Sequence, residues 1–129
     1  MTHESPSRYA CIDVGTNSIK ILIAEKGEEA IERVFESSQT TRIGQGMTPN
    51  SMRLREEPMR RSLETLSLFM EQAKLFQTKE ITAVGTAALR DAENRDDFLR
   101  RVSQRCGLKI EIIPGEEEEI GKASCRERV

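Results

Sequence analysis

The chain has 129 residues, which suits one domain and leaves no room for a second sizeable hydrophobic core. Hydrophobic residues make up 36% and charged residues 33%, a balance typical of an ordered protein with a solvated surface. Twenty Lys and Arg against 22 Asp and Glu give a net charge of −2, which excludes a strongly basic surface for nucleic acid. The apolar run at 21–24 is too short to cross a bilayer, and residues 1–8 lack the apolar segment of a signal peptide. We therefore expect a cytoplasmic protein with no nucleic-acid or membrane partner.

Short runs of β-branched residues predict the strands. The first two, at 9–12 and 19–24, flank a Gly/Thr/Asn/Ser turn and predict a β-hairpin. Three further strands are predicted at 31–35, 81–84 and 110–113, the first of them with an imperfect alternation.

Two segments have helical periodicity. The first runs from Pro58 to about Phe76 after a polar loop at 38–55. Its apolar stripe is Met59, Leu63, Leu66, Met70 and Ala73. The second begins near Asp91 or Asn94 and stops at Gly107, a residue suited to a helix C-terminus. Its apolar residues are Phe98, Leu99 and Val102. The order β-β-β-α-β-α-β predicts an α/β domain with a mixed sheet.

Histidine chemistry is excluded by composition, because the single histidine is His3, near the start of the chain. The three cysteines form no C-x-x-C pair, which argues against a zinc site. Any chemistry must therefore rest on carboxylates, hydroxyls, backbone amides and arginines.

The turn of the predicted hairpin, Asp13-Val14-Gly15-Thr16-Asn17-Ser18, is the first candidate site. A glycine after a strand lets backbone amides approach an anion, and the next three residues add small donors. Asp13 is placed to hold Mg²⁺ beside phosphate oxygens. The alternative is an ordinary turn in which Asp13 and Asn17 bond their own backbone.

Two arginines and an acidic run supply further candidates. Arg90 follows the predicted strand at 81–84, where ligands of α/β sheets gather, and can bind a phosphate unless it pairs with Asp91, Glu93 or solvent. Arg42, in the predicted loop at 38–55, is likewise a candidate for binding a phosphate. The run at 116–119 contains four glutamates, which either start a solvated helix or supply a general base.

Four segments together resemble the exopolyphosphatase and guanosine pentaphosphate phosphohydrolase family (Ppx/GppA). They are IDVGTNSIKILIAE, TTRIGQGM, AVGTAALRDAENRDDFL and EIIPGEEE. The resemblance covers roughly residues 9–118, and the order and spacing of the set make it specific.

The resemblance implies a ribonuclease-H-like lobe of the actin-like ATPase superfamily. It also implies a phosphohydrolase that releases the terminal phosphate from inorganic polyphosphate or guanosine pentaphosphate, assisted by Mg²⁺ or another divalent cation. Charge neutralisation and a positioned water suffice for this reaction, so a site without histidine is adequate. A homodimer of the full-length enzyme is compatible with the resemblance.

The family's motifs also imply roles for individual residues. Asp13 would lie near the metal, and Glu118, with Glu117 beside it, would be the catalytic base. The implied phosphate-binding residues are Gly15, Thr16, Asn17, Ser18, Arg90 and Arg42.

The sequence departs from the family pattern at two points. Residues 119–129, after Glu118, have few apolar positions, and the family's other phosphate loop, of the type Asp-Ile-Gly-Gly-Gly-Ser/Thr, does not appear. We therefore expect a disordered segment at 1–8, one lobe at 9–118 and an atypical tail at 119–129. This would be half of a two-lobed site, inactive by itself. The alternatives are a non-catalytic phosphate or nucleotide sensor and a sugar or acetate kinase lobe.

Overall fold

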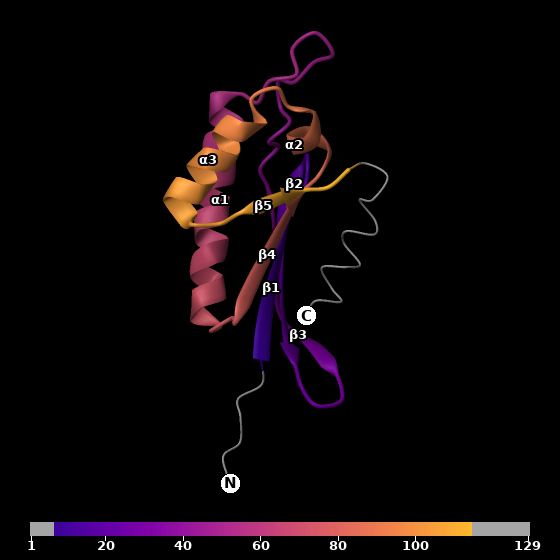
Figure 1. Cartoon of the computed structure of the whole chain (residues 1–129), viewed down its shortest axis with the longest axis vertical. Helices are drawn as coiled ribbons and strands as arrows, with labels where there is room; N and C mark the ends of the chain where they lie inside the picture. The colour runs from indigo at the N-terminus through magenta and orange to yellow at the C-terminus, as the bar shows by residue number, and fades with distance from the viewer. Residues whose placement is uncertain (1–6, 115–129) are drawn as a thin grey trace.

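A computed structural model describes residues 7–114 of the chain (Figure 1). Its elements are β1 (Ser7–Val14), β2 (Ser18–Lys26), β3 (Ile31–Thr40), α1 (Glu56–Leu75), β4 (Glu80–Gly85), α2 (Ala87–Asp91), α3 (Arg95–Cys106) and β5 (Ile110–Ile112). The strands form one five-stranded sheet in the order β3-β2-β1-β4-β5. β1 is antiparallel to β2 and parallel to β4, so the predicted mixed α/β architecture is confirmed.

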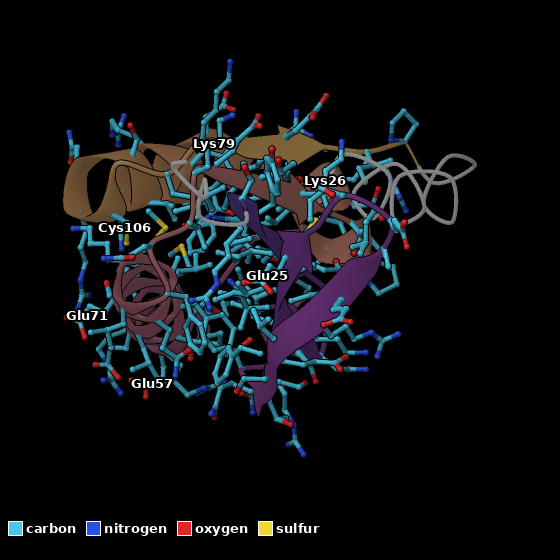
Figure 2. All side chains as sticks on the ribbon, turned by 90° about the horizontal axis from the view of Figure 1, so that it is seen from below. Glu25, Lys26, Glu57, Glu71, Lys79 and Cys106 are labelled. Carbon is cyan, nitrogen blue, oxygen red and sulfur yellow. The ribbon has the colours of Figure 1, made fainter. Side chains whose placement is uncertain are left out.

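The first two strands alternate as the sequence predicts. Ile19, Ile21 and Ile23 are fully buried, and Ile12 and Val14 of β1 lie in the same core. Because successive side chains of a strand point to opposite faces, these residues share one face of the sheet. Helices α1 and α3 lie side by side on that face (Figures 1 and 2).

Helix α1 confirms the predicted amphipathic stripe. Pro58 lies in its first turn, and Met59, Leu63 and Leu66 are buried against the sheet. Phe69 is fully buried as well, and widens the apolar face beyond the predicted stripe. None of the helices in the described part of the chain is long and apolar enough to span a membrane.

Helix α3 ends as predicted, with Gly107 in the left-handed conformation at φ 67°. The five-residue helix α2 is an addition to the predicted order, because the sequence predicted the next helix after β4 only from Asp91 or Asn94 onward. Phe98 and Val102 of α3 are fully buried, which confirms its apolar face.

Two strands differ from their predicted bounds. β1 begins at Ser7, so Ser7 and Arg8 are paired with β2, although a disordered segment was expected up to residue 8. β3 extends to Thr40, five residues beyond the predicted end and into the expected loop. It is an edge strand whose side chains are mostly exposed, so burial imposes no clear alternation on its sequence. Residues 1–6 and 115–129, and with them the predicted tail at 119–129, lie outside the described range.

Candidate functional site

Three segments that the sequence singled out separately meet at one edge of the sheet. β1 and β4 are parallel neighbours, with Val14 beside Gly85, so their carboxyl ends lie together. The turn after β1 and the segment after β4 therefore start from adjacent points. Thr86 N–H donates to the Val14 carbonyl at 3.2 Å and ties the second segment to the first strand.

The loop at 41–44 joins this edge through backbone hydrogen bonds to the β1–β2 turn. The Asn17 carbonyl accepts from the N–H groups of Thr41 (3.1 Å) and Arg42 (3.0 Å), and the Thr16 carbonyl accepts from Gly44 (3.4 Å). A methyl group at Gly44 would lie 2.8 Å from Thr16 Cγ2 and 3.4 Å from Ala88 Cβ. Gly44 therefore lies where the turn, the loop and helix α2 meet.

The β1–β2 turn is rich in hydrogen-bond donors that have no partner within residues 7–114. These are the backbone N–H groups of Thr16 and Asn17 and the side chains of Thr16, Asn17 and Ser18. Gly15 differs, because its N–H donates to the Ser18 carbonyl at 3.0 Å and closes the turn. The predicted alternative, in which the Asn17 side chain bonds its own backbone, is not observed; its carbonyl holds the neighbouring loop instead.

Arg42 and Arg90 flank this turn on the loop and on α2. Arg42 is exposed, its side chain makes no hydrogen bond or ion pair within the described residues, and its backbone is left-handed at φ 50°. Such a conformation costs a non-glycine residue about 1–2 kcal/mol and is often found at functional sites.

Arg90 is only partly engaged. Its Nε donates to Asp91 Oδ1 at 3.3 Å, as the alternative interpretation of this arginine predicted. Its Nη1 is buried and has no hydrogen-bond partner in the described part of the chain. Because a buried donor is normally satisfied, this N–H group is available to an anion or an ordered water.

Asp13 lies in β1 opposite Lys20 of β2, next to Val84 of β4. It is half-buried and, since Ile12 and Val14 face the helices, it points to the other face of the sheet. Within residues 7–114 no three His, Cys, Asp or Glu side chains gather to hold a metal ion. Any cation near Asp13 would take further ligands from water and phosphate, as Mg²⁺ commonly does.

Glu117 and Glu118, the predicted catalytic pair, lie outside the described residues. The predicted residues that the structure brings to one edge are therefore Asp13, Gly15, Thr16, Asn17, Ser18, Arg42 and Arg90.

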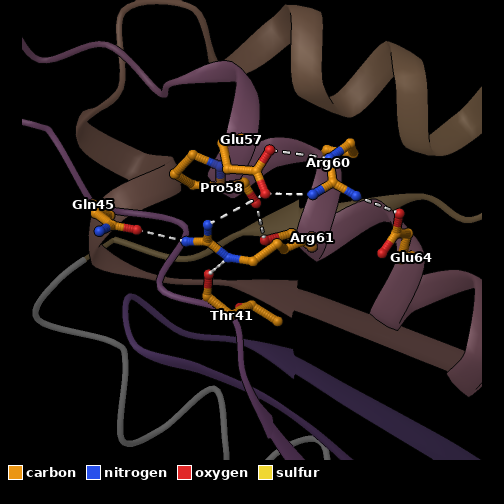
Figure 3. Close-up of polar contacts among 8 residues, drawn as sticks. Thr41, Gln45, Glu57, Pro58, Arg60, Arg61 and Glu64 are labelled. Carbon is orange, nitrogen blue, oxygen red and sulfur yellow. Dashed lines mark hydrogen bonds and ion pairs between the residues drawn. The ribbon is translucent and has the colours of Figure 1, made fainter.

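Some residues that build the edge carry no evident sequence signal. The Asn94 side chain accepts from Leu54 N–H at 2.8 Å and donates to the Leu54 carbonyl at 3.0 Å, so it clamps the end of the long loop. Arg61 of α1 donates to the Thr41 carbonyl at 3.1 Å and to Gln45 Oε1 at 2.6 Å (Figure 3). Both contacts join segments far apart in the chain, which local patterns do not reveal.

Comparisons with known proteins identify relatives of this chain by sequence. Residues 22–121 match the model of the Ppx/GppA phosphatase family. The "guanosine-5'-triphosphate,3'-diphosphate pyrophosphatase" of Vibrio atlanticus is 37% identical over 114 residues, which is 88% of this chain and 23% of that protein. The protein of the same name from Photobacterium profundum is 36% identical over 110 residues, 85% of this chain and 22% of that protein.

Solved structures of the same family have a similar fold. The Ppx/GppA enzyme of Aquifex aeolicus superposes with a TM-score of 0.80 at 29% identity, over 84% of this chain and 36% of that one. An exopolyphosphatase from Cytophaga hutchinsonii superposes with a TM-score of 0.83 at 26% identity, over 87% of this chain and 36% of that one. The chain spans about a quarter of the length of the curated relatives it matches. On the sequence match and the shared fold, this chain belongs to the Ppx/GppA phosphatase family.

Proposed function

We propose that this chain forms one side of a site that hydrolyses a phosphoanhydride bond and releases the terminal phosphate of inorganic polyphosphate or guanosine pentaphosphate. The observation that carries the proposal is the convergence of donors at one sheet edge. The turn at 15–18 offers amide and hydroxyl groups without partners in the described residues, and Arg42 and Arg90 lie on the two adjoining segments. A polyanion with many acceptor oxygens satisfies such a set of donors.

The names of the relatives support both substrate classes. The curated relatives carry the name of a guanosine pentaphosphate pyrophosphatase, and the Cytophaga hutchinsonii structure that of an exopolyphosphatase. Both substrates end in a phosphate joined through an anhydride oxygen, so one terminal-phosphate site serves either. A net charge of −2 is no obstacle, because the donors are local.

The proposal also assigns a divalent cation, such as Mg²⁺, beside Asp13. The fit is reasonable, because Mg²⁺ is typically held by one or two carboxylates together with substrate phosphates. When bound there, the cation would neutralise charge on the phosphate chain. The turn at 15–18 would orient the terminal phosphate, and Arg90 Nη1 would donate to one of its oxygens.

Glu118 is proposed as the base that takes a proton from the attacking water. The water oxygen forms a bond to the terminal phosphorus, the bridging P–O bond breaks, and the shortened phosphate chain leaves with the bond's electrons. Because the family resemblance implies a site between two lobes, the 129-residue chain alone is expected to have little or no turnover.

The test measures Mg²⁺-dependent phosphate release from polyphosphate and from guanosine pentaphosphate. The positive controls are the Cytophaga hutchinsonii exopolyphosphatase for polyphosphate and the Vibrio atlanticus relative for guanosine pentaphosphate. We expect the chain alone to bind without measurable turnover. Turnover comparable to that of the relative, lost in Glu118→Ala, would support the reaction but contradict the half-site. Binding that survives Glu118→Ala, with no hydrolysis when a second lobe is supplied, would favour a sensor. ATP-dependent phosphorylation of a sugar or acetate would indicate a kinase.

A further inference from the structure

The loop that carries Arg42 adopts a backbone that needs external support. Arg42 is in the left-handed region at φ 50°, although it is not a glycine. On one side the loop is held by the Asn17 carbonyl, which accepts from the N–H groups of Thr41 and Arg42. A left-handed backbone is unfavourable for a non-glycine residue and persists only where its surroundings fix it.

Arg61 supplies the support on the other side. From the second turn of α1 its Nε donates to the Thr41 carbonyl at 3.1 Å, and its Nη2 donates to Gln45 Oε1 at 2.6 Å (Figure 3). One guanidinium therefore spans Arg42, with one contact at the residue before it and one at the third residue after it. The planar fork of arginine suits two such contacts, whereas lysine offers a single point of charge.

Glu57 helps to hold the Arg61 guanidinium in place. Its Oε1 lies 3.8 Å from Arg61 Nη1. A hydrogen bond from Arg60 is the main cause that lowers the pKa of the Glu57 carboxyl, with the charge of Arg61 adding to it. Glu57 therefore stays ionised at neutral pH and remains a counter-ion for Arg61.

Arg60 is a natural control for Arg61. It is the preceding residue on the same helix, but its partners are Glu57 and Glu64 of α1, and Figure 3 shows it pointing away from Thr41 and Gln45. Its side chain is 54% exposed, against 32% for Arg61. Replacing either arginine removes one positive charge, but only Arg61 touches the loop.

We propose that Arg61 is a positioning residue that fixes the 41–45 loop and so aims Arg42 at the anion. The aiming rests on the proposed function, because it needs a phosphate at the adjoining turn. Arg61 itself does not touch that turn: within residues 7–114 its side chain contacts the Thr41 carbonyl, Gln45 and Glu57. It is therefore no catalytic residue.

The first measurement is amide hydrogen exchange of the whole 129-residue chain, which needs no ligand. In Arg61→Ala we expect the N–H groups of Thr41 and Arg42 to exchange about tenfold faster, because the loop opens more often. Arg60→Ala should leave both within about twofold. Unchanged exchange of the Ile12 and Ile21 amides would show that the fold is intact. Equal exchange of the loop in Arg61→Ala and in the unsubstituted chain would overturn the proposal, as would the same acceleration in Arg60→Ala.

The second measurement is calorimetric binding of inorganic tripolyphosphate with Mg²⁺. Arg61→Ala should weaken binding about tenfold, Arg61→Lys should recover part of the loss, and Arg60→Ala should match the unsubstituted chain. If Arg61 acts through Arg42, the Arg42→Ala/Arg61→Ala double variant should bind no more weakly than Arg42→Ala. Additive losses would mean that Arg61 does not act through Arg42.

The two measurements separate failure of this inference from failure of the proposed function. If the unsubstituted chain binds no tripolyphosphate, the proposed function fails and the aiming of Arg42 fails with it. Hydrogen exchange still decides whether Arg61 holds the loop. If the unsubstituted chain binds and Arg61→Ala binds equally well, the proposed function stands and the role of Arg61 is contradicted.

Discussion

Replacing Gly85 by alanine tests how tightly the carboxyl end of β4 is packed. A methyl group at Gly85 would lie 2.7 Å from Leu89 Cδ1 and 3.1 Å from both Ile110 Cγ2 and Ile112 Cδ1. Carbon atoms in favourable contact are about 3.5–4.0 Å apart, so the methyl overlaps side chains from α2 and β5 together. Leu89 is fully buried and Ile110 is 6% exposed, which leaves them little room to move away.

The expected cost follows from these contacts. Overpacking of a core costs about 1–3 kcal/mol, and three simultaneous overlaps place Gly85→Ala near the top of that range. Alanine also lowers the entropy of the unfolded chain, which offsets about 0.5–1 kcal/mol. The net loss is about 2 kcal/mol, which lowers the Tm of a domain of this size by about 8 °C.

Thermal unfolding followed by circular dichroism measures this loss, with Gly27→Ala as the matched control. A methyl group at the exposed Gly27 would lie 3.5 Å from the Ala30 carbonyl, an ordinary contact. The control should therefore stay within about 0.5 kcal/mol of the unsubstituted chain. A Tm for Gly85→Ala within about 2 °C of the unsubstituted chain would refute the packing argument, as would an equal fall in the control.

Three further substitutions test other contacts. Asn94→Ala removes both hydrogen bonds to Leu54 and should cost about 1–3 kcal/mol in urea unfolding; no loss would mean that water replaces the clamp. Phe98→Ala empties a fully buried site and should cost about 3–5 kcal/mol, against less than about 0.5 kcal/mol for the exposed Ser103→Ala. Hydrogen bonds from Arg101 lower the pKa of the Glu56 carboxyl from its usual value of 4.5. The ionised Glu56 therefore stabilises the folded chain above pH 4.5, and this stabilisation is lost on acidification as the carboxyl takes up a proton. Stability should therefore fall more between about pH 6 and pH 3 in the unsubstituted chain than in Glu56→Gln, and equal pH profiles would contradict the coupling.

Much of the fold could be predicted because its signals are local. Ile19, Ile21 and Ile23 alternate since one face of β2 is buried, and this alternation alone defines the strand. The stripe of α1 and the glycine at the end of α3 are signals of the same kind. The turn at 15–18 could be identified because Gly, Thr, Asn and Ser are the residues that such a turn needs.

The features that were missed depend on contacts between distant segments. Helix α2 is five residues long and is too short for a helical period to show. β3 is an exposed edge strand, so burial imposes no regular alternation on it. Asn94 and Arg61 act on residues 40 and 20 positions away, and nothing beside them in the sequence marks this. The convergence of Arg42, Arg90 and the turn follows only from the sheet order and the backbone bonds of the Asn17 carbonyl.

The central claim is that three segments at one sheet edge form a phosphate site, and a nuclear magnetic resonance titration tests it most directly. Inorganic tripolyphosphate with Mg²⁺ is added to the isotope-labelled 129-residue chain, and the backbone amide shifts are followed. We expect the largest changes at 15–18, 41–44 and 86–90, with Arg90→Ala weakening them. Absence of shifts at these segments would contradict the account, as would changes centred on Lys74 and Arg105 in the groove between α1 and α3.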